Sequence, residues 1–279
     1  MSMRAALSVA VRLAASAPRR RVAVVPPVAP SGRARSDARV TELQSALPSP
    51  QHPPLPVLFR DEWFVAVEKP SGLLVHRDER HPDAPAVLQV LRDQLGRYLY
   101  PVHRLDRPTS GVLIYGFSSA DAAAMQASMQ EPAAEKGYQT LVRWPGSVAG
   151  LGDRWQCDRP LHDERDVARD AHSEFWLLEP FRHCALVECR ITTGRYHQIR
   201  RHLNHCGRHV LGDTTHGKGR LNALYRARYG LDRLFLHSHL LAVRHPHTGE
   251  RLELRAPLPP GLDAVLGRLR AEPPRAPSE

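Results

Sequence analysis

The sequence contains few of the residues that build disulfide frameworks or membrane spans. Its 279 residues include only four cysteines, and no two of them form a C-x-x-C pair. This scarcity argues against an extracellular disulfide scaffold and favours a reduced, cytoplasmic setting. No apolar run approaches the roughly 20 residues of a transmembrane helix, so we expect no membrane partner. A glycine-rich phosphate loop of the P-loop or dinucleotide type is also missing.

Acidic residues are scarce in the first part of the chain. Residues 1–50 contain eight Arg against one Asp and one Glu, within a net charge of +10 for the whole chain. A basic balance favours a polyanionic partner but says nothing about the fold. We expect residues 1–50 to form a disordered basic tail; an organelle transit peptide or a misplaced start codon are the alternatives. Residues 51–269 are then the folded domain, and residues 270–279 a disordered, Pro-rich end.

Hydrophobic periodicity predicts both strands and helices in the central region. The strand patterns cover residues 57–59, 63–67, 112–115, 138–143, 185–192, 235–244 and 251–255. The helical patterns cover residues 83–95, 119–129 and 195–206, and Met125 and Met129 are expected to be core residues. Strands and helices do not alternate regularly, so we expect an α+β fold around a mostly antiparallel sheet flanked by helices.

The densest polar cluster lies directly before the apolar strand at 112–115. Residues 103–111 read H-R-L-D-R-P-T-S-G, and Pro108 and Gly111 predict a shaped loop. Asp106 is flanked by two arginines, and nearby cations keep a carboxylate ionised even when it is partly desolvated. On this pattern alone, an aspartate that caps a turn or pairs with an arginine is a more frequent outcome than a catalytic one.

Residues 103–111 resemble the H-R-L-D-x-x-T-S-G signature of the RluA family of RNA pseudouridine synthases. Three further segments resemble motifs of the same family in the same order: 69–76 (K-P-S-G-L-L-V-H), 136–142 (K-G-Y-Q-T-L-V) and 193–200 (T-G-R-Y-H-Q-I-R). Gly212-Asp213 follows at the expected distance, and the resemblance extends over residues 55–265. It implies the pseudouridine synthase catalytic fold and an isomerase that needs no metal and no cofactor.

The resemblance also implies roles for individual residues. Asp106 acts as nucleophile or proton acceptor, Arg200 is its counter-ion, and Tyr138 lies under the uracil. Whether Asp106 attacks C1′, adds to C6 or removes the C2′ proton stays open, although the family favours the last route, through a glycal. The expected RNA contacts, with Arg104 filling the gap left by an extruded uridine and Leu105 in the pocket wall, are Arg104, Leu105, Arg107, Arg195, His197 and Arg201.

Finer details resemble the subgroup of the family that modifies uridine 65 of tRNA. They are Arg107-Pro108 in the aspartate loop, the D-R-P-L of residues 158–161, and residues 212–217 with His216 where many relatives carry Tyr. Lys218 and Ser238 depart from the family pattern. The stretch 195–220 has six Arg or Lys, five His and one acid, which suits RNA phosphates. We expect a monomer that binds tRNA; a ribosomal-RNA synthase is the alternative.

Functions of other classes fit less well. A catalytically silent RNA-binding protein on the same fold would not need the intact aspartate loop. A glycosidase or nucleosidase needs a second carboxylate at motif spacing, and none stands out. The histidine pairs 202/205, 237/239 and 245/247 lack acidic or thiolate partners at a recognised spacing, so we expect structural or RNA-contacting histidines there.

Overall fold

The computed structural model describes residues 52–77, 79, 81–144 and 153–272. The basic tail expected for residues 1–50 lies outside this range, as do residues 273–279. Both expectations therefore stay predictions. Within the described residues, no helix is long and apolar enough to cross a membrane.

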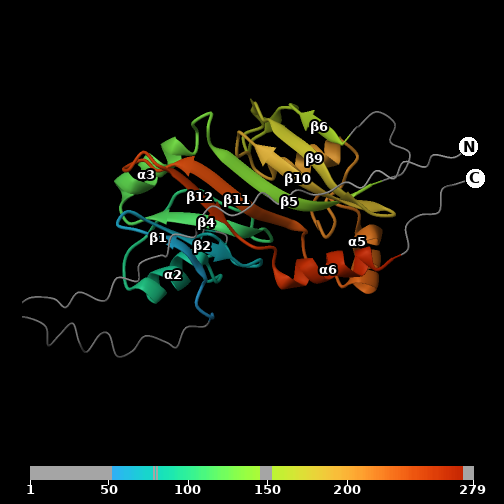
Figure 1. Ribbon diagram of the computed structural model, residues 1–279, viewed down its shortest axis with the longest axis horizontal. Coiled ribbons are helices and arrows are strands. Elements are labelled where there is room, and N and C mark those ends of the chain that lie inside the picture. Colours follow the sequence, from blue (N-terminus) through green and yellow to red (C-terminus); the bar gives the residue numbers. More distant parts are fainter. Residues whose placement is uncertain (1–51, 78, 80, 145–152, 273–279) are drawn as a thin grey trace, which may run out of the picture. The chain divides into compact units, whose positions relative to one another are not determined.

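Ten of the described strands form one sheet (Figure 1). Its main order is β1-β2-β4-β11-β5-β10-β9-β6, while β12 also pairs with β11 and β3 with β4. The strands are β1 Val57–Arg60, β2 Phe64–Lys69, β3 Tyr100–Pro101, β4 Ser110–Gly116, β5 Glu135–Arg143, β6 Arg154–Cys157, β9 Ser173–Pro180, β10 Cys184–Ile191, β11 Leu236–Arg244 and β12 Arg251–Arg255. Two short strands, β7 Leu161–His162 and β8 Ala168–Arg169, make a separate ribbon.

Strand direction confirms the expected fold class. Among the described pairings, β4 and β11 run parallel and the others run antiparallel. The helices are α2 Val87–Leu95, α3 Ser119–Ser128, α4 Gln198–His205, α5 Gly219–Tyr229 and α6 Pro260–Arg270. Figure 1 shows α3 at one end of the strands and α5 beside α6 at the other. The fold is therefore α+β around a mostly antiparallel sheet.

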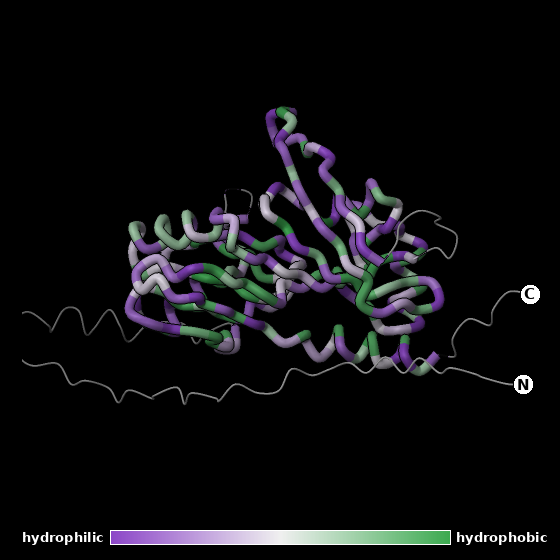
Figure 2. The backbone as a smooth tube through the Cα atoms, turned by 45° about the horizontal axis from the view of Figure 1, so that its top comes forward, coloured by the Kyte–Doolittle hydropathy of each residue, from purple (hydrophilic) through white to green (hydrophobic). Residues whose placement is uncertain are grey.

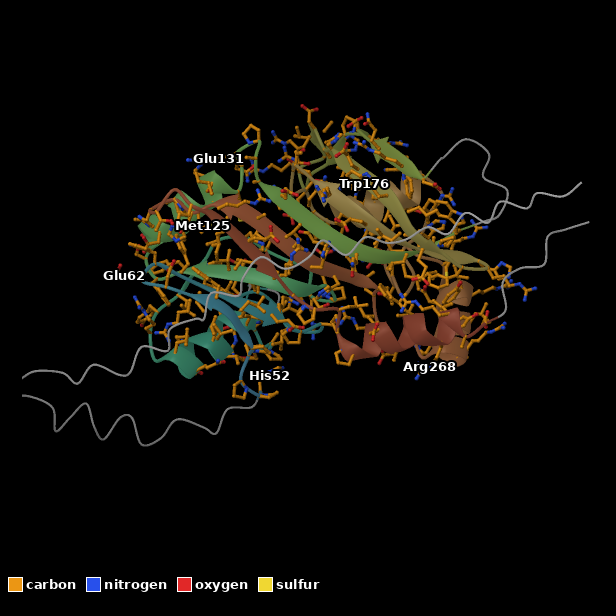
Figure 3. The ribbon with its side chains drawn as sticks, in the orientation of Figure 1. His52, Glu62, Met125, Glu131, Trp176 and Arg268 are labelled. Carbon is orange, nitrogen blue, oxygen red and sulfur yellow. The ribbon has the colours of Figure 1, made fainter. Side chains whose placement is uncertain are left out.

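The two faces of the sheet bury different apolar groups. Tyr138 of β5 and Cys189 of β10 lie opposite each other and belong to the largest buried cluster. Three pairs further along the same two strands, Leu141 and Leu186 lie on the other face and pack in one cluster with residues of α5 and α6. Figure 2 shows that hydrophobic residues concentrate in the strands. Met125 (labelled in Figure 3) and Met129 are 0% and 6% exposed, which confirms them as core residues.

Several elements differ from the sequence-based expectation. The helix predicted from residue 83 begins at Val87. Ala86 is extended and pairs with Leu74, whose amide donates to the Pro85 oxygen and whose oxygen accepts from the Val87 amide. Helices α5 and α6 and strands β6 and β9 were not predicted. For α6 the signal was present, since Leu262, Val265, Leu266 and Leu269 recur at helical intervals and are buried.

Gly111, the first residue after the Thr109-Ser110 pair, needs to be glycine for two reasons. Its backbone has a φ of +121°, and an added Cβ would lie 2.1 Å from the backbone oxygen of Ser238 on β11. Gly72 has a similar φ of +93° but open space around it. An alanine at position 72 would therefore cost only the backbone strain, whereas an alanine at position 111 would add a steric clash.

We predict that Gly111→Ala lowers the free energy of unfolding by about 3 kcal/mol or more, because backbone strain of roughly 1–2 kcal/mol adds to overpacking of roughly 1–3 kcal/mol. Gly72→Ala should show the backbone contribution alone. Urea denaturation of both variants measures the difference. Equal losses in the two variants would contradict the close approach of β4 and β11.

Candidate active site

The aspartate loop is held in place by a buried lysine. Lys69, at the end of β2, is fully buried, and its Nζ donates to the carbonyl oxygens of Pro70 (2.9 Å), Arg107 (3.1 Å) and Thr109 (2.7 Å). Burial lowers the pKa of Lys69 to about 7, whereas three carbonyl acceptors favour its ammonium form. The Lys-Pro-Ser-Gly segment and the aspartate loop, which carries Asp106, therefore form one structural unit.

Ser71 and Gly72 add to this unit. The Ser71 hydroxyl donates to the oxygen of Pro108 at 2.8 Å, and the backbone of Gly72 exchanges bonds with Arg107. One of these bonds comes from the Arg107 side chain, whose Nε donates to the Gly72 oxygen at 2.9 Å. Two segments about 35 residues apart in the chain are thus cross-linked through hydrogen bonds to backbone oxygens.

Arg200 joins two carboxylates. Its Nη1 donates to Asp106 Oδ2 at 3.0 Å, and its Nε and Nη2 donate to the two oxygens of Asp213, each at 2.7 Å. The side chains of Arg200 and Asp213 are 3% and 1% exposed, against 18% for Asp106. Burial opposes the charge on Arg200, but its bonds to Asp213 and Asp106 raise the pKa above its ordinary value. The guanidinium is therefore a permanent, oriented cation beside the more accessible carboxylate.

Asp213 is oriented by the backbone that follows it. Its Oδ1 accepts bonds from the amides of Thr215 (2.8 Å) and His216 (2.9 Å). Burial raises the pKa of Asp213, but these bonds and those from Arg200 outweigh it and keep the pKa below its usual range. Because both of its oxygens are occupied, Asp213 is not placed to act as a second acid at the site.

A pair of histidines closes the arrangement. His197 Nδ1 lies 2.9 Å from His216 Nε2, and His197 Nε2 lies 3.7 Å from Asp106 Oδ2. His197 has a left-handed backbone with a φ of 53°, a strained conformation for a residue other than glycine. Burial lowers the pKa of His197 to about 4, so the ring is neutral at pH 7 and acts as a hydrogen-bonding group rather than as a cation.

Asp106 lies between two cavities. The larger, of about 550 Å³, is bordered by the aspartate loop, the 71–76 segment and residues 212–215. The smaller, of about 160 Å³, is lined by Tyr138, Leu236 and the start of α4. A cavity of about 150 Å³ accommodates benzene, so the smaller space suits one six-membered ring. Asp106 lines both cavities.

Tyr138 forms the floor of the smaller cavity. It lies on β5 directly opposite Ser238 of β11, the position that departs from the family's alanine. Burial above all, and then the nearby Cys189, raise the pKa of Tyr138, so the hydroxyl stays protonated at neutral pH. The side chain is 9% exposed and offers a neutral aromatic surface to this cavity.

The structure brings most of the predicted site residues together. Arg104, Leu105, Asp106, His197 and Arg200 line both cavities, Arg107 lines the larger one, and Tyr138 and Arg195 line the smaller one. Arg201 lines neither cavity, and its Nη1 instead donates to the His162 oxygen at 3.0 Å.

Sequence reasoning assigned no role to Lys69, Asp213 or His216. All three stand inside quoted segments of the sequence, and that was the available signal. Across the described residues, no group of three or more His, Cys, Asp or Glu is placed to hold a metal ion.

Comparison with solved structures defines the class of protein. Human RNA Pseudouridylate Synthase Domain Containing 4 superposes with a TM-score of 0.64 at 22% identity, covering 79% of this chain and 95% of that one. Human RNA Pseudouridylate Synthase Domain Containing 1 gives a TM-score of 0.60 at 22% identity, over 80% and 97% of the two chains. The fold is therefore that of the pseudouridine synthase catalytic domain.

Sequence comparison is more specific. The family model described as RNA pseudouridylate synthase matches residues 63–205. A Vibrio cholerae protein named tRNA pseudouridine synthase C is 38% identical over 243 residues, covering 78% of this chain and 95% of that protein. A Salmonella typhimurium protein of the same name is 36% identical over 228 residues, or 73% and 85% of the two chains. The chain belongs to the RNA pseudouridylate synthase family, as its RluA-type motifs predicted, and is an isomerase.

We predict that Asp213→Asn lowers kcat about 100-fold, because a small misplacement of the Arg200 guanidinium relative to Asp106 removes that order of rate. The loss should appear in kcat at saturating RNA, without a comparable rise in KM. Asp263→Asn, on an exposed position of α6, is the matched control and should behave like the wild type. Wild-type kcat in Asp213→Asn would show that Asp213 does not position the arginine.

Proposed function

We propose that this protein converts uridine to pseudouridine in tRNA, with Asp106 as the catalytic carboxylate. The observation that carries this proposal is the position of Asp106 between a ring-sized cavity and a larger open one, paired with a buried arginine. The reaction breaks the C1′–N1 bond and joins C1′ to C5 of the same base, so nothing is oxidised and no water is consumed. One carboxylate and a closed pocket supply its main requirements.

The proposed roles follow from the two cavities. The target uridine leaves the stack, since its C1′, N1 and C5 cannot rearrange in place, and its base enters the small cavity over Tyr138. Asp106, held by Arg200, then faces the sugar and acts as nucleophile or as proton acceptor. Leu105 and Leu236 border the small cavity and help to exclude water, which would otherwise hydrolyse the detached intermediate.

The distribution of ion pairs supports an RNA substrate at this face. Within the described residues, Arg104, Arg107 and Arg195 at the cavities have no carboxylate partner within 4 Å, and Arg107 and Arg195 bond only to backbone oxygens. On the opposite face of the sheet, Arg154 and Arg190 are paired with acids, in Arg154–Glu174 and Arg190–Glu135. Unneutralised arginines around one cavity suit a polyanion, and phosphates take the place of the missing carboxylates.

A second basic region lies beside α5. A further cavity of about 650 Å³ is lined by Arg143, Lys218 and Arg220 together with Leu221 and Leu224. Its lining residues 217–221 come soon after residues 212–215, which border the 550 Å³ cavity. The Arg143 amide donates to the His209 oxygen at 2.9 Å, which holds Arg143 near this stretch of chain. We propose that this cavity contacts the phosphates of a helical RNA whose target uridine occupies the active site.

A tRNA target, at uridine 65, is the more specific part of the proposal. Its support is the name of the Vibrio and Salmonella relatives together with Arg107-Pro108 and His216 at the site. We further propose that the protein acts as a monomer in the cytoplasm. A glycosidase receives no support, because the neighbouring acid, Asp213, has both oxygens bound to Arg200.

We predict that Asp106→Asn abolishes pseudouridine formation while RNA binding persists, since the substitution removes the charge but keeps the size of the side chain. Tritium release from 5-tritiated uridine in unmodified tRNA measures the reaction, and a filter-binding assay measures affinity. The wild type should be equally active in EDTA. Isomerase activity in Asp106→Asn would overturn the catalytic role of this residue.

The RNA target is tested separately, by mapping pseudouridine in total RNA from cells that lack the gene. We expect loss of a tRNA pseudouridine at position 65 with intact ribosomal sites, and its return on complementation with the wild-type gene but not with Asp106→Asn. Loss of a ribosomal site with an intact tRNA site would contradict the tRNA assignment and favour the ribosomal alternative.

A further inference from the structure

Tyr196 is a large aromatic side chain left exposed at the entrance to the active site. It is 55% exposed, although aromatic side chains of this size contribute most when they are covered. It lines both the 550 Å³ cavity and the 160 Å³ cavity, as Asp106 does. Its position is the open one in the motif T-G-R-x-H-Q-I-R, and the roles described above leave it unused.

One face of the Tyr196 ring is already stacked against a neighbouring side chain. The ring is stacked on His197 with centroids 3.7 Å apart and an interplanar angle of 21°. His197 is in turn held by its bond to His216 at 2.9 Å and by its left-handed backbone. The tyrosine is therefore oriented before any ligand arrives, and its exposed area belongs to the parts of the ring that His197 does not cover.

The stack is close to the reacting centre. His197 Nε2 lies 3.7 Å from Asp106 Oδ2, so the imidazole on which Tyr196 stacks also borders the Asp106 carboxylate. The target base is assigned to the smaller cavity over Tyr138. A flat group on Tyr196 would therefore be a second base, from a nucleotide next to the extruded one.

The surroundings of Tyr196 favour such a nucleotide over a purely apolar ligand. Arg104 lines both of the cavities that Tyr196 borders, and Arg195 precedes it in the chain. An open aromatic face beside cations without carboxylate partners matches a base attached to a phosphate. Stacking of this kind tolerates any base, because every base has a π-face.

We infer that Tyr196 is a stacking platform for an RNA base that flanks the target uridine. The inference rests on the proposed function, since it takes the smaller cavity as the site of the target base. The platform stabilises the RNA in the distorted form that extrusion creates, so its contribution falls on binding of the substrate rather than on the bond rearrangement.

The test uses the full-length protein and tRNA carrying 2-aminopurine next to the target uridine. With the wild type we expect quenching of the 2-aminopurine fluorescence on binding. Tyr196→Ala should lose most of this quenching and bind about 5- to 150-fold more weakly, which corresponds to the 1–3 kcal/mol of one base–aromatic stack. The loss should appear in Kd and KM. Tyr196→Phe keeps the ring and should restore both quenching and affinity.

Two further variants control for indirect effects. Tyr196→Leu keeps apolar bulk without an aromatic face and should resemble Tyr196→Ala, even if the alanine variant disturbs the start of α4. Tyr98→Ala removes a tyrosine that is 78% exposed and borders neither cavity, and it should bind like the wild type.

Wild-type quenching and affinity in Tyr196→Ala or Tyr196→Leu would overturn the platform. Failure of the proposed function looks different: the wild type would then form no pseudouridine, whatever the Tyr196 variants do in binding.

Discussion

The site depends on one guanidinium that serves two carboxylates. Arg200 comes from α4 and Asp106 from the loop before β4, 94 residues apart in the chain. Asp213 takes two of the arginine's nitrogens and leaves Nη1 for Asp106. A buried ion pair is costly unless its charges are balanced and its hydrogen bonds are satisfied, and Asp213 provides this balance. Asp106 is then left partly accessible, with an oriented guanidinium beside its carboxylate.

The aspartate loop that carries Asp106 is itself held in place by Lys69 and Gly111. The Lys69 ammonium fills the inside of the turn and donates to three backbone carbonyl oxygens of this unit. Gly111 then allows β4 to approach β11 closely enough for parallel pairing. These are interior features, but their effect is to fix the direction of the Asp106 side chain at the edge of the loop.

Much of this arrangement was predictable from sequence, although for two different reasons. The strand patterns and the α+β class followed from hydrophobic periodicity, which depends on local sequence and burial. The convergence of Asp106, Tyr138 and Arg200 did not; it was predicted only because the motifs resemble a known family. Nothing local in residues 198–205 indicates that Arg200 turns inward while the adjacent Arg201 turns towards His162. The inward orientation of Arg200 depends on its hydrogen bonds to Asp213, which only the tertiary structure brings next to it.

The two faces of the sheet differ in whether their arginines are paired with acids. Alternate residues of a strand face opposite sides, so Cys189 shares the face of Tyr138 while Arg190 lies on the other. There, Arg154 and Arg190 flank Trp176 (labelled in Figure 3) at 5.2 and 5.4 Å and are also paired with acids. A polyanion gains little by approaching arginines that are already neutralised. Under the proposed function, the paired charges on one face and the unpaired arginines on the other favour the approach of RNA to the side where Asp106 lies.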